Sequence, residues 1–337
     1  MKNHQRTKKS NGKYLSVIIV LFFIFCLAQV SQPGSVYAQL FPKRPVIVIN
    51  PLKPGGGTDV ELRNMSPYLQ KYLGQPIIIK NIPGGGTTIA TAAANKSKPN
   101  GYTTIVFVLP TASLAQELLK TQTRVEQFEF IYAWFSGPND VTVQANSPYK
   151  DFKDLLAAGK NKKLKVSTAG VGSSSHLFAL LLEKYAGLKA VPIPYPGGAP
   201  AITALIRGDV DFYCGLSTTS VRFVQAGQVR QLAILGPKPL EILPDTPTIY
   251  SLGIKDWPYI PFVRGVAAPP KTPKAIVKVL AGAFKKAVDD PGFRAIMKKQ
   301  GRPITLFSGE EMKQVALDGL DLAKKYVPIM KQPSNSK

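Results

Sequence analysis

The motif Pro-Gly-Gly-Gly-Thr occurs twice in the chain, at residues 54–58 and at residues 83–87. Each copy follows a short β-branched run and precedes a helix-like segment. Glycine has no side chain, so the backbone at these positions can take positive φ and a ligand can approach it closely. Each copy therefore predicts a strand–turn–helix corner, which is the repeating unit of an α/β fold.

A corner of this kind can bind an anion. The first turn of a helix leaves backbone amides without helical partners, and the helix dipole adds partial positive charge there. In the first copy, Thr58 or Asp59 is expected to cap the helix by accepting from these amides. Neither copy contains a Walker A or G-x-G-x-x-G sequence, so neither indicates a nucleotide site. One such corner could be only a tight turn, but its repetition favours a function.

Further along the chain, more predicted strands end in glycine or small polar residues. Strands alternate with helices, which predicts mainly parallel sheets, and ligands of such folds bind beyond the carboxyl ends of the strands. We therefore expect two lobes whose corners face each other across a cleft, with the chain crossing between lobes near residues 143–147. The residues at these further strand ends are Thr111, Ser113, Gly172, Ser173, Ser174, Ser175, His176, Tyr195, Gly197, Gly198, Ser217 and Thr218.

The size and composition of the chain agree with two lobes. It has 337 residues, of which 45% are hydrophobic and 19% charged, so it can bury a core and is not a disordered chain. Lys and Arg number 43 against 20 Asp and Glu, a net charge of +23. Nucleic acid, an anionic membrane surface and anionic small ligands are the partners that such a charge suggests. The lysines fall mostly on outer helix faces rather than in an aromatic-lined stripe, so no nucleic acid is expected.

Residues 1–38 have the pattern of a secretory signal. Five basic residues precede the apolar stretch 15–28, and Val36-Tyr37-Ala38 resembles a cleavage site. Cleavage near Ala38 predicts a periplasmic protein whose charge falls to 23 − 5 = +18. An uncleaved anchor is the alternative, although the stretch is shorter than the roughly 20 residues that a span needs. Bulky Phe25 argues against a lipoprotein anchor at the following cysteine.

Cleavage would leave one cysteine, Cys214, and one histidine, His176. An intramolecular disulfide is then impossible, and the apolar surroundings of Cys214 predict a buried packing residue. One histidine and one distant cysteine form no transition-metal site, so neither a metal nor a cofactor is expected.

His176 follows three serines, so a Ser–His hydrolase is an alternative. The G-x-S-x-G elbow is absent around Ser173–Ser175. A serine and a histidine side by side at one helix start are also poorly placed for proton abstraction, which needs an orienting third group. A ligand contact or a helix-start role is favoured, and no enzymatic activity is expected.

A series of short motifs runs through nearly the whole mature chain. They are Pro-Gly-Gly-Gly-Thr-Asp at 54–59, Gly-Gln-Pro at 74–76, Asn-x-Pro-Gly at 81–84, Asn-Gly-Tyr-Thr at 100–103, the loop 170–176, Tyr-x-Gly-Gly at 195–198, Gly-Asp-Val-Asp at 208–211, Pro-Asp-x-Pro-Thr at 244–248 and Ala-Pro-x-x-x-Pro at 268–273. In this order they resemble the TctC or Bug family, the extracytoplasmic solute receptors of tripartite tricarboxylate transporters.

The resemblance implies a two-lobed periplasmic-binding-protein-like fold of type II (Venus flytrap), α/β in class, with a mainly parallel sheet in each lobe and a ligand cleft between them. Residues 39–143 and 263–337 would form lobe 1, and residues 144–262 would form lobe 2. The implied partners are a small carboxylate and the small and large membrane subunits of a transporter, with the receptor itself a monomer.

The resemblance also implies which loops hold the ligand. In that family two loops pinch a carboxylate, largely through backbone amides, hydroxyls and bound water. Carried over to this chain, the first loop is Gly55, Gly56, Gly57, Thr58 and Asp59, and the second is Gly172 to His176. Tyr195, Gly197 and Gly198 would line the cleft, with Ser217 and Thr218 as further candidates.

This chain departs from the family pattern at three positions. Leu52 stands where an aromatic residue is usual, Ala204 where a carboxylate is usual, and Val263 where tryptophan is frequent. Arg264 lies beside the last of these. Loss of an acidic group with an arginine nearby suggests the hypothesis that Arg264 binds a second negative charge on the ligand.

The identity of the ligand stays open at this point. Dicarboxylates, tricarboxylates, acidic amino acids and aromatic acids would all suit an amide-lined pocket. A carboxylate sensor without a dedicated transporter is the alternative function, followed by a basic nucleic-acid-binding protein.

Overall fold

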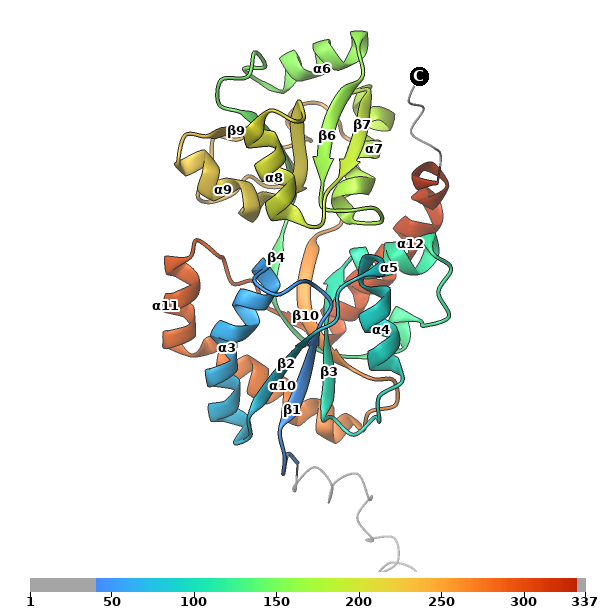
Figure 1. Ribbon diagram of the computed structural model, residues 1–337, viewed down its shortest axis with the longest axis vertical. Helices are drawn as coiled ribbons and strands as arrows, with labels where there is room; N and C mark the ends of the chain where they lie inside the picture. The colour runs from blue at the N-terminus through green and yellow to red at the C-terminus, as the bar shows by residue number, and fades with distance from the viewer. Residues whose placement is uncertain (1–40, 332–337) are drawn as a thin grey trace, which may run out of the picture.

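The computed structural model describes residues 41–331, so the predicted signal segment lies outside the described residues. The chain forms two α/β units, one above the other, each built on one sheet (Figure 1). The first sheet has six strands in the order β11-β4-β10-β3-β1-β2, and the second has five in the order β7-β6-β8-β5-β9. The strands are β1 (Val46–Asn50), β2 (Ile77–Asn81), β3 (Thr103–Leu109), β4 (Glu129–Gly137), β5 (Asn139–Gln144), β6 (Leu164–Thr168), β7 (Ala190–Pro194), β8 (Phe212–Leu216), β9 (Val229–Leu235), β10 (Phe262–Ala268) and β11 (Phe307–Ser308).

Helices cover both faces of the first sheet. In β1, Val48 packs into one apolar cluster and Ile49 into another, which explains why the strand is apolar on both faces. These helices are α3 (Gly57–Leu73), α10 (Lys274–Asp289) and α11 (Pro291–Lys299) on one face, and α4 (Thr88–Asn95), α5 (Thr111–Leu118) and α12 (Gly309–Met330) on the other. The cluster around Val48 contains side chains of α3, α10 and α11, and the cluster around Ile49 contains side chains of α4, α5 and α12.

The second sheet is covered in the same way. Tyr213 of β8 packs with one pair of helices, and its neighbour Cys214 packs with the other pair. Cys214 is fully buried, as predicted. The pairs are α8 (Gly198–Arg207) with α9 (Ser217–Gln225), and α6 (Phe152–Asn161) with α7 (Ser174–Ala186); the short 3₁₀ turns η1 (Gly85–Thr87) and η2 (Val125–Gln127) belong to the first unit.

Each sheet is mixed, with most of its strands running in one direction as expected. β10 lies between β3 and β4 and is antiparallel to both, and β5 lies between β8 and β9 and is antiparallel to both. The chain reaches β5 from the first sheet and β10 from the second. Each of these two strands therefore enters its sheet at the edge that faces the other unit. Its neighbours end at that edge, so it must run antiparallel to them.

The chain changes sheet earlier than the sequence suggested. β4 ends at Gly137 and β5 begins at Asn139, so the change falls at Pro138. The expected crossing at 143–147 lies at the end of β5, within the second sheet. The return is at Phe262, where β10 begins, next to the expected position 263.

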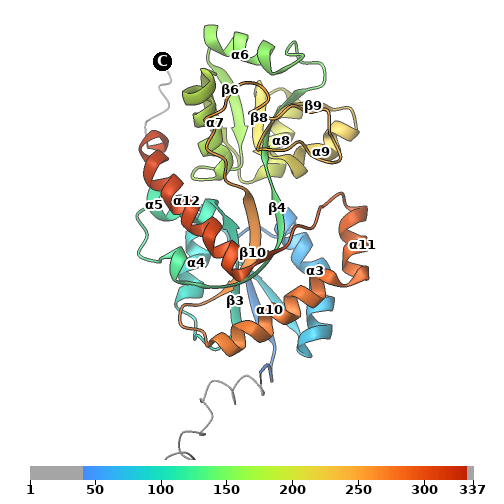
Figure 2. The same ribbon diagram turned by 180° about the vertical axis from the view of Figure 1, so that it is seen from behind.

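The C-terminal helix also contacts the second unit. Figure 2 shows α12 along one side of the molecule, reaching toward α7. The hydroxyls of Tyr326 in α12 and Tyr185 in α7 are hydrogen-bonded, and the centres of their rings lie 6.5 Å apart. Among residues 41–331, no helix is long and apolar enough to cross a membrane.

Candidate functional site

The glycine corners lie where the carboxyl ends of the strands of one sheet face those of the other (Figure 1). The corners after β1 and β2 belong to the first unit, and those after β6 and β7 belong to the second. At this edge the amide of Ser174 in the second unit donates to Thr111 Oγ1 in the first at 3.4 Å, so the two units are in contact. Residues far apart in the sequence thus meet between the two units, as the sequence predicted.

The first corner leaves the amides at the start of α3 without helical partners. The helix begins at Gly57, with Gly56 as N-cap and no side-chain cap. The amide of Val60 donates to the carbonyl of Gly56, so the amides of residues 57–59 precede the helical ladder. The expectation that Thr58 or Asp59 caps the helix is wrong, because both residues lie inside the first turn. Free amides at a helix start favour a bound anion.

The carboxylate of Asp59 is bonded within the corner. It accepts from Gly55 N at 2.9 Å, from Arg63 Nε at 2.9 Å and from Asn81 Nδ2 at 2.9 Å. Burial alone would raise the pKa of Asp59, but these hydrogen bonds and the charge of Arg63 lower the pKa to about 2. Asp59 therefore shapes the loop, and its charge is offset by Arg63.

Two buried polar atoms of the first corner have no hydrogen-bond partner within residues 41–331. They are Thr58 Oγ1, in a residue 1% exposed, and Asn50 Nδ2, in a fully buried residue. A buried polar group without a partner is costly, so such groups are rare in folded proteins. Together with the free amides, they make the first corner a set of donors suited to a small anion.

The second corner is shaped by close packing. Gly84, Gly85, Gly86 and Thr87 all have positive φ, a region that side chains rarely occupy. A Cβ on Gly86 would lie 3.3 Å from Cβ of Ala115 in α5 and 3.8 Å from the carbonyl oxygen of Val171 in the second unit. Glycine is therefore needed here for the corner to approach α5 and the other unit.

The third corner is held by its own serines and histidine. Ser173 caps α7 by accepting from the amide of His176 at 3.2 Å, and its hydroxyl donates to the carbonyl of Gly170 at 2.7 Å. The hydroxyl of Ser175 accepts from the amide of Ala169 at 2.9 Å. Nδ1 of His176 accepts from the amide of Gly172 at 3.4 Å, and burial lowers the pKa of His176. Burial thus favours the neutral ring, and because Nδ1 accepts, its proton lies on Nε2.

The fourth corner packs against the start of α9. Gly197 has φ 121°, and its amide donates to the carbonyl of Tyr195 at 2.8 Å. A Cβ on Gly198 would lie 3.3 Å from Thr219 Oγ1. Tyr195 and Thr218 are half-buried at this edge.

A groove of about 180 Å³ lies between the units beside the second and third corners. Its walls are mainly apolar, and both units contribute to them. The lining residues are Gly85, Gly86, Ala115, Leu118, Leu119, Val171 and Gly172.

Three predicted site residues have structural partners instead. The buried hydroxyl of Ser113 donates to the carbonyl of Ala316 in α12 at 2.9 Å. The buried hydroxyl of Ser217 donates to the carbonyl of Pro138, where the chain changes sheet, at 2.9 Å. Arg264 is 6% exposed and pairs with Glu61. The hypothesis that Arg264 binds a second ligand charge is therefore corrected, because Glu61 already supplies its counter-charge.

Two buried clusters around carboxylates were not predicted from the sequence. Glu61 accepts from Trp134, Arg264 and Arg302. Asp140 in β5 accepts from Thr142 Oγ1 at 3.1 Å and also from the side chains of Ser220 and Gln231. In β5, the alternation of polar Asp140 and Thr142 with apolar Val141 and Val143 was the available signal for the second cluster.

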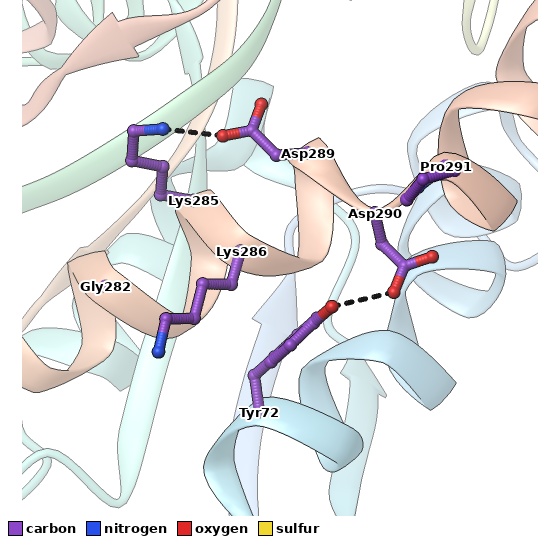
Figure 3. Close-up of a pocket in the computed structure, with 7 residues that line it drawn as sticks. All are labelled: Tyr72, Gly282, Lys285, Lys286, Asp289, Asp290 and Pro291. Atoms are coloured by element: carbon purple, nitrogen blue, oxygen red, sulfur yellow. Dashed lines mark hydrogen bonds and ion pairs between the residues drawn. The ribbon is translucent and has the colours of Figure 1, made fainter.

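A larger hollow of about 420 Å³ lies outside this edge, between the end of α3 and the junction of α10 with α11 (Figure 3). Its carboxylates are already paired: Asp289 with Lys285 at 2.6 Å, and Asp290 with Lys71 at 3.0 Å and with the Tyr72 hydroxyl at 2.8 Å. The contacts of Asp290 join the end of α3 to the start of α11, so the hollow is a structural junction. No group of three or more His, Cys, Asp or Glu side chains within residues 41–331 could hold a metal.

Comparison with known proteins gives the same family as the motifs. The model of the tripartite tricarboxylate transporter family receptors matches residues 62–332. Protein BugT of Bordetella pertussis is 31% identical over 267 residues, which cover 77% of this chain and 81% of BugT.

Solved structures of similar proteins share the fold. A solute-binding protein of the same family from Polaromonas, without ligand, is 28% identical with a TM-score of 0.71, covering 86% of this chain and 99% of that one. MatC from Rhodopseudomonas palustris, with bound malate, is 28% identical with a TM-score of 0.75, covering 85% of this chain and 100% of that one.

Proposed function

The chain belongs to the tripartite tricarboxylate transporter family of receptors, and on this premise we propose that it captures a small carboxylate in the periplasm and delivers it to the small and large membrane subunits of such a transporter. The receptor acts by binding alone, as a monomer, after cleavage of residues 1–38. The two lobes close on the ligand from opposite sides of the cleft.

The first corner carries this proposal. Its free amides at residues 57–59 lie beside Thr58 Oγ1 and Asn50 Nδ2, which have no hydrogen-bond partner within residues 41–331. A carboxylate accepts several hydrogen bonds at once and is favoured by a helix N-terminus. The malate bound by MatC, a similar receptor, supports the same class of ligand.

The third and fourth corners supply the opposite wall in this proposal. Gly172 to His176, Tyr195, Gly197 and Gly198 face the ligand, with Thr111 and Thr218 at the margins. Ser113, Ser217 and Arg264 are left out because their polar groups bond residues outside the corners, namely Ala316, Pro138 and Glu61. Dicarboxylates, tricarboxylates and aromatic acids are the candidate ligands.

A thermal-shift screen of the mature protein tests the proposal. The protein is refolded to remove any bound acid and is then heated with citrate, malate, aspartate, adipate or benzoate. A ligand at one hundred times its Kd adds about 2.7 kcal/mol to the free energy of unfolding, which is visible as a rise in Tm. We expect a rise with one class of acid.

Two matched variants locate the binding site. Gly57→Leu adds a side chain at the first residue of α3, where its Cβ would lie 3.2 Å from Arg302 Nη1, and it should abolish the rise in Tm by disturbing the corner. Gly282→Leu puts the same side chain on an exposed helical glycine of α10 with no neighbouring atoms within 4 Å, and it should keep the rise. If no acid raises Tm and the protein instead binds DNA in a salt-sensitive manner, the receptor proposal is wrong.

A further inference from the structure

We infer that Glu61 is a positioning residue that couples the first glycine corner to both strands on which the chain crosses between the two units. The inference rests on the proposed function, because it concerns the corner proposed to bind the carboxylate.

Glu61 holds both crossing strands at once. It lies in α3 one turn beyond Gly57 and is 1% exposed. Trp134 Nε1, from β4, donates to Glu61 Oε2 at 3.0 Å. Arg264 Nη1, from β10, lies 2.5 Å from each carboxylate oxygen. β4 leads into the first change of sheet and β10 follows the second, so one carboxylate fixes α3 to both.

Arg302 extends this cluster to the corner itself. It lies beyond α11, and its Nη1 donates to Glu61 Oε1 at 2.6 Å and to the carbonyl of Gly57 at 3.0 Å. A Cβ on Gly57 would lie 3.2 Å from the same nitrogen. Arg302 therefore bonds both Gly57, the first residue of α3, and Glu61. A shift of β4 or β10 relative to α3 would displace the donor that fixes Gly57.

The cluster has few alternative arrangements. Arg264 is buried, and its guanidinium lies 4.7 Å from the ring centre of Phe135 and 5.4 Å from that of Phe262. Without Glu61, two guanidinium groups would lie together and one would be buried without a counter-charge. Removing one partner of a buried ion pair is far more costly than removing an exposed pair, so these side chains should move together.

Hydrogen–deuterium exchange of the ligand-free mature protein tests the inference. The variants are Glu61→Gln, Arg302→Gln and Arg302→Lys. The matched control is Lys71→Gln, which breaks the pair between exposed Lys71 of α3 and Asp290 at the other end of the same helix. In Glu61→Gln, we expect the hydrogen-bonded amides of the corner, those of Gly55, Gly56 and Val60, to exchange on the order of tenfold faster, and likewise the amides of residues 130–137 and 262–268. This is the effect of losing a charge-assisted hydrogen bond.

The other variants make the result specific. Arg302→Gln should speed exchange mainly at 54–60, and Arg302→Lys, which keeps a cationic donor, should recover part of the protection. Lys71→Gln should leave 54–60 unchanged, and no variant should alter residues 198–225 in the second unit. If Glu61→Gln does not fold, Arg302→Gln alone decides, because Arg302 lies at the partly exposed edge of the cluster.

Unchanged exchange at 54–60 in the folded variants would overturn the inference, and so would equal acceleration in both units, which indicates general destabilisation. The measurement needs no ligand. A protein that binds no acid but shows the selective acceleration would therefore contradict the proposed function and leave the coupling intact.

Discussion

Asp59 and Asp140 are both buried carboxylates, yet their surroundings shift their pKa values in opposite directions. Asp59 lies beside Arg63 and accepts backbone and side-chain hydrogen bonds that favour its charged form, so its pKa falls to about 2. Burial raises the pKa of Asp140 to about 6, although the side chains of Ser220, Gln231 and Thr142 donate to it. The two pKa values differ in direction because the cation Arg63 lies beside Asp59, whereas the groups that donate to Asp140 are uncharged.

The raised pKa of Asp140 predicts a pH-dependent stability. Between about pH 4 and pH 6 the folded protein binds a proton at Asp140 that the unfolded chain does not, so this group stabilises the fold increasingly as pH falls. Above pH 6 its charge costs roughly 3 kcal/mol. We expect Asp140→Asn to gain free energy of unfolding relative to the natural protein as pH rises from 4 to 6, measured by urea unfolding. A difference independent of pH would contradict this.

At the scale of single elements, α12 is placed by contacts at its first residue. Ser308 and Glu311 form a capping box, in which each side chain bonds the backbone amide of the other residue. Gly309 follows, and a Cβ on it would lie 2.2 Å from the carbonyl oxygen of Phe130 in β4. Because this neighbour is strand backbone, it cannot move aside.

Two glycine-to-alanine substitutions should therefore have opposite effects. Gly309→Ala should lower the free energy of unfolding by about 1–3 kcal/mol through overpacking. Gly282→Ala, at an exposed position of α10 with nothing within 4 Å, should raise it by about 0.5–1 kcal/mol through helix propensity. Urea unfolding at pH 7 compares the two. Equal effects would show that contact with β4 does not place α12.

Elements set by local signals could be predicted from the sequence. The apolar runs at Thr103–Leu109 and Leu164–Thr168 form strands, and Gly74 ends α3 in the left-handed region. The helices α5 and α9 were not predicted, because their first residues, Thr111 and Ser217, looked like the polar ends of the preceding strands. These two segments are helical because α5 packs on α12 and α9 packs on β9, contacts that the local sequence does not show.

Partners distant in the sequence could not be predicted. Glu61 lies 203 positions from Arg264 and 241 from Arg302, and no local pattern relates them. The placement of β10 between β3 and β4 is equally non-local. The corners that form the candidate site were recognisable because each is a short strand–glycine–helix sequence. Which of their atoms contact a ligand stays a prediction.

At the scale of the whole molecule, the two units differ in how the chain builds them. The five strands of the second sheet all lie within residues 139–235. The first sheet takes four strands from residues 46–137, but its inner strand β10 and helices α10 to α12 come from residues 262–330. The first unit is therefore incomplete without the C-terminal part of the chain.

A chain that stops at residue 261 should fold only in part. It keeps every strand of the second sheet and loses β10, which separates β3 from β4. We expect amide protection within residues 139–235 and rapid exchange within residues 46–109, measured by hydrogen–deuterium exchange. Protection of β1 and β3 in this truncated chain would show that the first unit folds without its C-terminal segments.

The late arrival of β10 has a consequence for biogenesis. Half of the molecule cannot finish folding until the ribosome has synthesised residue 268 and the helices after it. While residues up to the C-terminal helices are still being synthesised, the first unit stays incompletely folded. A translocation channel that accepts only extended polypeptide can engage the proposed N-terminal signal during this time. The order of segments along the chain would thus delay premature folding on the wrong side of the membrane, without help from any single residue of the binding site.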